Sequence, residues 1–173
     1  MKKNLVLTGM MGVGKSTIGR KLANKLKLKF ADIDRIIEKT QKKTIGDIFT
    51  KEGEKHFRQI EKKITLVELS KSQQVIALGG GAFLNKSIRN EVKNSSLSFW
   101  LDLNLDILYA RLKKSKKRPL LNDGNLEETI NKIYSERKKI YNESNFKIKC
   151  DSLGDEKIVI KIIKLYENAR NKS

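Results

Sequence analysis

The chain alternates short apolar segments with longer segments in which apolar residues recur every three or four positions. The short segments have the length and composition of buried strands, and the recurring pattern is typical of helices. Five segments are predicted to be strands: 4–8, 28–31, 74–78, 98–101 and 146–150. Helical patterns occupy 15–26, 35–42, 45–51, 53–71, 86–93, 104–114, 126–142 and 155–170. Such alternation predicts an α/β fold with a parallel sheet.

One stretch, 113–125, lacks a regular pattern. It reads KKSKKRPLLNDGN and combines charge with a proline and a glycine, so we expect a mobile loop. In an enzyme that binds a nucleotide, such a loop is a natural lid. The 173 residues contain no repeat and no linker, so we expect residues 1–173 to form one domain with its own core.

Composition narrows the environment of the protein. No apolar run approaches the roughly 20 residues of a membrane span, so we expect no membrane partner. The N-terminus lacks the apolar core and cleavage site of a signal peptide. The single cysteine, Cys150, cannot form an internal disulfide, which fits a reducing compartment. We therefore expect a cytoplasmic protein.

The formal net charge of +18 could indicate a nucleic-acid-binding protein. However, 30 of the 38 basic residues are lysines, and they are scattered from Lys2 to Lys172. The one dense cluster, 113–118, has no interleaved aromatic residues. We therefore expect no nucleic-acid partner. The positive charge is also compatible with a nucleotide substrate, because nucleotides are anions.

Residues 9–16, GMMGVGKS, match the phosphate-loop pattern G-x-x-x-x-G-K-[ST]. The glycines let the backbone curl so that its N–H groups point at phosphate oxygens, and the following helix directs its positive end to the same place. Lys15 should reach the β and γ phosphates, and Ser16 should hold Mg²⁺. A plain glycine turn is the alternative, but the strand before it and the helix after it favour the phosphate loop.

Asp32 and Asp34 follow the predicted strand 28–31. Ligands of open α/β sheets lie beyond the carboxyl ends of the strands. One carboxylate could order a water bound to Mg²⁺, and the other could orient a hydroxyl for attack. The alternative for Asp34 is a helix N-cap in front of residue 35.

Two arginines and three glycines are further candidates. Arg58 lies beside an apolar helical stripe, and its alternative is a surface pair with Glu61. Gly79–Gly81 follow a strand and would let another molecule approach the backbone, although a flexible turn is equally compatible. Arg137 falls on an apolar stripe at i+7 from Ile130, so we expect it to be partly buried. Its anionic partner is either a distant residue or a ligand, since no acid stands at i±3 or i±4.

Arg118 belongs to the loop segment RPLL and could swing over the phosphates to neutralise charge. The alternative is a solvated basic loop. Because the chain has only eight arginines against 30 lysines, we interpret Arg58, Arg118 and Arg137 as positions where the planar guanidinium matters.

Together these segments resemble the shikimate kinase family, a group of small P-loop kinases. The similarity covers nearly the whole chain and includes GMMGVGKST, ADID, IGDIFTKEGEKHFRQIE, IALGGGAF, RPLL and ERKKIYNES. The phosphate loop is shared by many families, whereas the order and spacing of Asp34, Arg58, Gly79–Gly81 and Arg137 are specific. Leu78, Ser144 and the stretch KCDSLGDEK depart from the family pattern.

The resemblance implies a three-layer fold in which a five-stranded parallel sheet is flanked by helices, with substrate-binding helices at about 33–62 and a lid at about 112–125. It implies transfer of the γ-phosphate of ATP to the 3-hydroxyl of shikimate, giving shikimate 3-phosphate and ADP in aromatic amino-acid biosynthesis. The implied cofactors are ATP and Mg²⁺, and the implied state is a monomer.

The resemblance also implies residue roles. The implied ATP-binding residues are Gly12, Val13, Gly14, Lys15, Ser16, Thr17, Arg111 and Arg118, with Arg111 against the adenine. The implied shikimate-binding residues are Asp34, Arg58, Gly79, Gly80, Gly81 and Arg137. Catalysis would fall to Asp34, Lys15 and Arg118. Ser16 would bind Mg²⁺, and Asp32 would reach it through water.

Two other functions stay open from the residues themselves. One is a related kinase that phosphorylates gluconate or a nucleoside monophosphate. The other is a P-loop protein that binds DNA or RNA through its positive charge, with steeply salt-dependent affinity.

Overall fold

The computed structural model describes residues 3–114 and 125–171. Within these residues, five parallel strands form one sheet in the order β2-β3-β1-β4-β5. The strands are β1 (Asn4–Thr8), β2 (Lys29–Asp32), β3 (Gln74–Ala77), β4 (Ser96–Asp102) and β5 (Phe146–Lys149). The predicted parallel α/β sheet is therefore confirmed, and all five predicted strands are present with shifts of one or two residues at their ends.

The central strand β1 is buried along its whole length. Leu5, Val6 and Leu7 have no exposed surface, and Leu5 pairs with Val75 of β3 and Leu97 of β4. A strand covered on both faces needs apolar side chains on both, so its sequence is a continuous apolar run without alternation. This strand places the segment that follows it, the phosphate loop, in the middle of the sheet edge.

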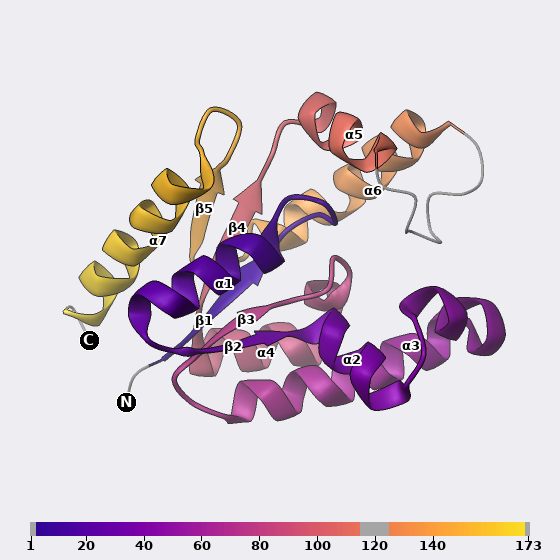
Figure 1. The fold of residues 1–173 in the computed structure, drawn as a ribbon, viewed down its shortest axis with the longest axis horizontal. Helices are drawn as coiled ribbons and strands as arrows, with labels where there is room; N and C mark the ends of the chain where they lie inside the picture. The colour runs from indigo at the N-terminus through magenta and orange to yellow at the C-terminus, as the bar shows by residue number, and fades with distance from the viewer. Residues whose placement is uncertain (1–2, 115–124, 172–173) are drawn as a thin grey trace.

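Helices cover both faces of the sheet. They are α1 (Lys15–Leu26), α2 (Ile33–Gln41), α3 (Ile45–Ser70), α4 (Lys86–Ser95), α5 (Leu105–Lys113), α6 (Leu126–Tyr141) and α7 (Asp155–Arg170). Helices α1 and α7 pack together on one face, and α3 and α4 pack together on the other (Figure 1). The sequence reading missed the short 3-10 helix η1 (Ala82–Leu84), which directly follows the three glycines.

Helix α3 is bent at Gly53, where φ is 82° and ψ is 163°. These angles interrupt the helical hydrogen bonds and suit a residue without a side chain. The prediction of two helical segments, 45–51 and 53–71, therefore corresponds to the two arms of one bent helix. Thr44 begins the first arm with a capping box, in which Asp47 is the reciprocal partner.

Helix α2 begins two residues earlier than predicted because Asp32 is its N-cap. The Asp32 side chain accepts a hydrogen bond from the backbone N–H of Arg35, and Asp34 lies in the first helical turn. The alternative interpretation of Asp34 as the N-cap is therefore wrong. A carboxylate in the first turn is also favourable near the positive end of the helix.

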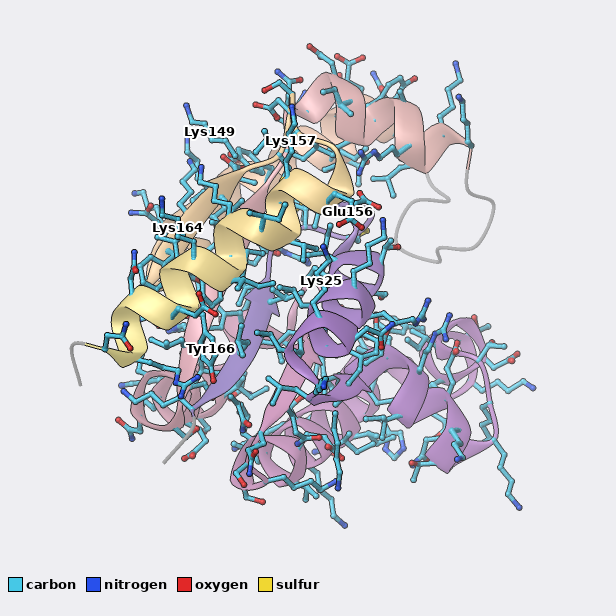
Figure 2. The ribbon with its side chains drawn as sticks, turned by 60° about the vertical axis from the view of Figure 1, so that its left-hand side comes forward. Lys25, Lys149, Glu156, Lys157, Lys164 and Tyr166 are labelled. Atoms are coloured by element: carbon cyan, nitrogen blue, oxygen red, sulfur yellow. The ribbon has the colours of Figure 1, made fainter. Side chains whose placement is uncertain are left out.

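Lysines cover much of the surface of α7 and β5. Figure 2 shows Lys149, Lys157 and Lys164 on this side of the molecule, with Lys25 of α1 next to Glu156. Lys25 and Glu156 form an ion pair of 2.8 Å. In the ranges 3–114 and 125–171, none of the helices has the length and apolarity needed to cross a membrane. Most of the predicted lid, with Arg118, lies outside the described residues.

Candidate active site

The phosphate loop joins β1 to α1 at the centre of the sheet edge (Figure 1). Gly14, with φ of 103°, is the N-cap of α1 and has no side chain with which to cap it. The N–H groups of the first turn of α1 therefore face the loop and are available to an anion. The strand, loop and helix that the sequence motif requires are all present.

Lys15 lies across this loop. Its Nζ donates to the carbonyl oxygens of Gly9 and Met10, both at 2.8 Å, and the residue is 8% exposed. A lysine held against the loop backbone brings a positive charge to the place where the N–H groups converge. This arrangement suits a polyphosphate.

A cavity of about 250 Å³ opens beside the loop. Its walls come from the phosphate loop, the start of α1, the junction of β2 with α2, and the end of β3. The lining residues are Met11, Gly12, Gly14, Lys15, Ser16, Thr17, Asp32, Asp34, Ala77, Leu78 and Gly80. Both predicted carboxylates therefore face the same space as Lys15 and Ser16.

Helix α5 covers the outer side of the phosphate loop. A Cβ atom placed on Gly12 would lie 2.8 Å from Cδ2 of Leu112, so the helix and the loop are in close contact. From the same helix, Nη1 of Arg111 donates to the carbonyl oxygen of Val13 at 3.4 Å. Arg111 thus lies against the phosphate loop from the side of α5.

The three glycines after β3 are crowded by polar side chains from other elements. A Cβ atom on Gly79 would lie 2.5 Å from Oε1 of Glu61 and 2.8 Å from Oδ1 of Asp34. A Cβ atom on Gly81 would lie 2.7 Å from both terminal nitrogens of Arg58. A side chain at Gly79 or Gly81 would push these charged groups of α2 and α3 out of their places. The flexible-turn alternative does not account for that crowding.

Gly80, the middle glycine, joins this group to the phosphate loop. A Cβ atom on Gly80 would lie 3.2 Å from the backbone nitrogen of Met11 and 3.5 Å from Nη1 of Arg137. We name the group formed by Asp34, Arg58, Glu61, Gly79–Gly81 and Arg137 the acceptor cluster. It adjoins the cavity beside the phosphate loop, and Asp34 and Gly80 line both.

Arg58 does pair with Glu61, at 2.6 Å between Nη1 and Oε2, but this is not a surface pair, since Glu61 is only 2% exposed. Glu54 holds the other side of the guanidinium, with Oε1 accepting from Nη2 at 3.1 Å. Burial acts to lower the pKa of Arg58, but Glu61 and Glu54 outweigh it, so the pKa is raised. Arg58 therefore stays charged and is fixed in orientation by two carboxylates.

Glu61 is a member of the site that was not predicted as a site residue. Burial raises the pKa of its carboxyl and Asp34 adds to the rise, while Arg58 and Arg137 oppose it. Its Oε1 atom is buried and has no hydrogen-bond partner among the described residues. One signal was available in the sequence: Glu61 stands four residues after Phe57 and four before Thr65, so the three residues share a face of the helix. In the structure all three are buried. A polar residue on a buried helical stripe is a candidate for a functional site.

Arg137 is 9% exposed, so the expected burial is confirmed. It projects from α6 toward Gly80 and the hydroxyl of Tyr141. Burial raises the pKa of Tyr141, and the positive charge of the nearby Arg137 guanidinium opposes that rise. At the end of α6, the hydroxyls of Ser144 and Thr8 are 3.0 Å apart and hydrogen-bonded, so the helix is tied to the end of β1.

The charges of the acceptor cluster nearly balance, with two guanidinium groups and the carboxylates of Asp34 and Glu61 in one crevice. Planar guanidinium groups match a carboxylate ligand, and a carboxylate accepts hydrogen bonds from hydroxyls. No group of three or more acidic, histidine or cysteine side chains within 3–114 and 125–171 could hold a metal by itself. A phosphate loop on the central strand of a parallel sheet, next to a separate polar crevice, defines the class of P-loop kinases.

Comparison with known proteins assigns the family within this class. The shikimate kinase family model matches residues 11–167. A shikimate kinase from Thermodesulfovibrio yellowstonii is 38% identical over 169 residues, which is 98% of this chain and 98% of that protein. A shikimate kinase from Bartonella quintana is 39% identical over 96% of this chain and 80% of its own length. The chain belongs to the shikimate kinase family and is a phosphotransferase.

Solved structures agree with this family. The structure of shikimate kinase from Acinetobacter baumannii in complex with shikimate has a TM-score of 0.92 at 32% identity, covering 96% of this chain and 94% of that one. A gluconokinase from Sinorhizobium meliloti has a TM-score of 0.56 at 15% identity, covering 99% and 98% of the two chains, and this similarity shows the fold alone. The comparison therefore separates the family from the related kinases.

Proposed function

We propose that this chain transfers the γ-phosphate of ATP to the 3-hydroxyl of shikimate, with the acceptor cluster as the shikimate site. Family membership supports the reaction, which gives shikimate 3-phosphate and ADP in aromatic amino-acid biosynthesis. The observation that carries the site assignment is the crowding of Gly79 and Gly81. Asp34 of α2 and Arg58 of α3 reach these glycines directly beside the phosphate loop.

Arg58 and Arg137 bind the carboxylate of shikimate. Their guanidinium groups lie against Gly81 and Gly80, so a carboxylate between them meets donors from two helices. Arg58 is held by Glu54 and Glu61, which reduces the side-chain entropy lost when the ligand binds. Gly79, Gly80 and Gly81 offer their backbone groups to the ring.

Asp34 orients the attacking hydroxyl and helps to accept its proton. It lines the cavity that Lys15 also lines, so a hydroxyl bound to Asp34 faces the terminal phosphate of ATP. Positioning of this kind supplies most of the catalysis in phosphoryl transfer, because the transition state is loose and needs little covalent help.

The phosphate loop binds ATP. The N–H groups around Gly12, Val13 and Gly14 surround the phosphates, and Lys15 neutralises the charge that develops during transfer. Ser16 and Thr17 stand at the start of α1. Arg111 packs against the adenine from α5, and Arg118 closes on the phosphates from the lid at about 112–125.

Mg²⁺ fits the donors of this cavity. Ser16 provides a hydroxyl and Asp32 a carboxylate, and both line the same space. Mg²⁺ keeps several waters and takes few protein ligands, which agrees with a site made of one hydroxyl, one carboxylate acting through water, and the phosphates of the nucleotide. When bound, the ion neutralises charge on the phosphates.

We further propose a single domain spanning residues 1–173, with substrate-binding helices at about 33–62. It acts as a cytoplasmic monomer without a nucleic-acid or membrane partner. The lysines of α7 and β5 are then a solvated surface.

The test is ADP release with ATP, Mg²⁺ and one acceptor at a time. We expect turnover with shikimate and none above background with gluconate or a nucleoside monophosphate. Release with gluconate alone would replace the assignment by the related kinase. DNA binding that persists at physiological salt would support the nucleic-acid alternative, since charge-driven attraction weakens steeply as salt rises.

A further inference from the structure

The three glycine carbonyls of the acceptor cluster differ in how they are held. The carbonyl of Gly79 accepts from the N–H of Ala82, and that of Gly81 accepts from the N–H of Leu84, both at 3.1 Å. Both are hydrogen bonds of the turn that forms η1. The carbonyl of Gly80 instead accepts from the hydroxyl of Tyr141, which comes from α6. A side chain 61 residues away therefore holds the middle peptide group.

Tyr141 is itself rigidly held. It is 1% exposed, its ring packs against Trp100 of β4 with centroids 5.9 Å apart, and its hydroxyl lies 3.9 Å from the sulfur of Met10. Arg137 stands one helical turn earlier, and its guanidinium lies beside the same glycine, with Nη1 3.5 Å from the Cβ position of Gly80. One hydroxyl thus joins the glycine segment, the phosphate loop and the arginine of α6.

Three consecutive glycines do not fix their own backbone, because each has access to a wide range of φ and ψ. A peptide group is planar, so a hydrogen bond on the carbonyl of Gly80 also fixes the direction of the N–H of Gly81 on the opposite side. Gly81 is the residue against which the Arg58 guanidinium lies. The orientation of this peptide group therefore decides how the backbone meets both arginines.

We propose that Tyr141 is a positioning residue for the acceptor site: its hydroxyl fixes the Gly80–Gly81 peptide group and the Arg137 guanidinium relative to each other. It does not touch the substrate. This inference rests on the proposed function of the acceptor cluster, and it predicts an effect on the acceptor side only. The backbone of the phosphate loop keeps its own hydrogen bonds when the hydroxyl is removed.

The chain offers a matched control for removing this hydroxyl. Tyr166 of α7 is 2% exposed and donates to the backbone carbonyl of Lys3 at 3.2 Å, so it makes the same type of bond in an equally buried position. It lies near the ends of the chain, at the far end of α7 from the phosphate loop (Figures 1 and 2). Tyr141→Phe and Tyr166→Phe each remove one such hydroxyl.

The experiment measures the Kd of shikimate and of ADP by calorimetry, together with kcat, KM and Tm, for the wild-type chain and both variants. We expect Tyr141→Phe to raise the Kd and KM of shikimate about tenfold and to leave the Kd of ADP within about twofold. Both variants should lower Tm by a few degrees, and Tyr166→Phe should leave both Kd values unchanged.

A second measurement tests the mechanism. If Tyr141 acts through Arg137, the double variant Arg137→Lys with Tyr141→Phe should lose less shikimate affinity than the two single losses multiplied together. The same cycle with Tyr166→Phe should be multiplicative. Multiplicative losses in the Tyr141 cycle would overturn the proposed link to Arg137.

The remaining outcomes are also decisive. An unchanged shikimate Kd in Tyr141→Phe would overturn the proposal, and so would loss of ADP binding, because the hydroxyl would then serve the whole fold. The wild-type chain distinguishes these two results for Tyr141→Phe from a failure of the proposed function. A wild-type chain that binds ADP but neither binds nor phosphorylates shikimate would refute the function itself.

Discussion

The phosphate loop and the acceptor cluster lie side by side but are built in opposite ways. The loop is one continuous segment between β1 and α1, and it offers an anion mainly backbone N–H groups and one lysine. The acceptor cluster gathers side chains from α2, α3 and α6 around a glycine segment after β3. Its members are up to about a hundred residues apart in the chain, and each is fixed by a neighbour.

This difference has a physical consequence. Backbone groups are present at every residue, so a phosphate site needs the right curvature and tolerates many side chains. A small ligand that carries both a carboxylate and hydroxyls must be distinguished by charged and hydrogen-bonding side chains in fixed positions. Substitutions in the acceptor cluster should therefore change the use of shikimate while leaving the nucleotide site intact.

The largest expected effect is that of Asp34→Asn, which keeps the shape of the side chain and removes its charge. We expect kcat to fall by about 10²–10⁴-fold, since the hydroxyl loses the group that orients it and accepts its proton. Tm should change by no more than a few degrees. Steady-state kinetics and a thermal melt measure both quantities, and turnover near that of the wild-type chain would remove Asp34 from the mechanism.

Next in size are Arg58→Ala and Arg137→Ala. A charge-assisted hydrogen bond contributes about 1.5–3 kcal/mol, so each variant should raise the KM of shikimate roughly 10- to 150-fold. The KM of ATP should stay within about threefold. Arg20→Ala is the control, because Arg20 is an exposed arginine on α1 and should change neither value. Equal increases for both substrates would contradict the division between the two regions.

Two glycine substitutions sharpen the comparison. In Gly79→Ala, the new Cβ would stand 2.5 Å from Glu61 and 2.8 Å from Asp34, so we expect about a tenfold higher KM for shikimate. In Gly14→Ala, the left-handed φ of 103° costs roughly 1–2 kcal/mol, and the KM of ATP should rise instead. Gly46→Ala meets only an ordinary contact of 3.7 Å and serves as the control. A higher KM for ATP in Gly79→Ala, or a higher KM for shikimate in Gly14→Ala, would show that the two sites act as one unit.

The same difference explains which parts of the molecule could be predicted from the sequence. The five strands and the phosphate loop are local patterns, and both are present in the structure as expected. Asp34, Arg58 and Arg137 are brought to the three glycines as the family resemblance implied, although their roles stay predictions. Arg111 contacts the loop, whereas Arg118 is outside the described residues.

The parts that could not be predicted depend on contacts between distant elements. Glu61 was considered only as a possible surface partner of Arg58, because its helical position hints at burial but its contact with the glycine segment depends on the fold. Tyr141 is not among the predicted site residues, because its bond to Gly80 depends on how α6 packs against the segment that follows β3. The alternative interpretation of Asp34 as an N-cap is wrong because the strand and helix meet without a loop, so Asp32 takes that place.

The smallest effect we predict concerns Glu61 and the pH dependence of stability. Burial raises the pKa of Glu61 above its ordinary value of 4.5, so the folded chain keeps this proton over a pH range in which the unfolded chain releases it. The stabilisation by the bound proton is therefore complete below pH 4.5 and is lost as pH rises through the raised pKa. Glu61→Gln is neutral at every pH and should remove this loss.

Urea unfolding of the wild-type chain and Glu61→Gln between pH 4.5 and 7 measures the difference. We expect the variant to become progressively more stable relative to the wild-type chain as pH rises. Glu52→Gln is the control. Lys43 lowers the pKa of Glu52, and that stabilisation is lost only as pH falls below 4.5, so the difference between this variant and the wild-type chain should stay constant from pH 4.5 to 7. Parallel curves for the wild-type chain and Glu61→Gln would mean that Glu61 ionises normally. If the curves diverge, the buried carboxylate of the acceptor cluster titrates beside Asp34, and the shikimate KM should follow pH while the ATP KM does not.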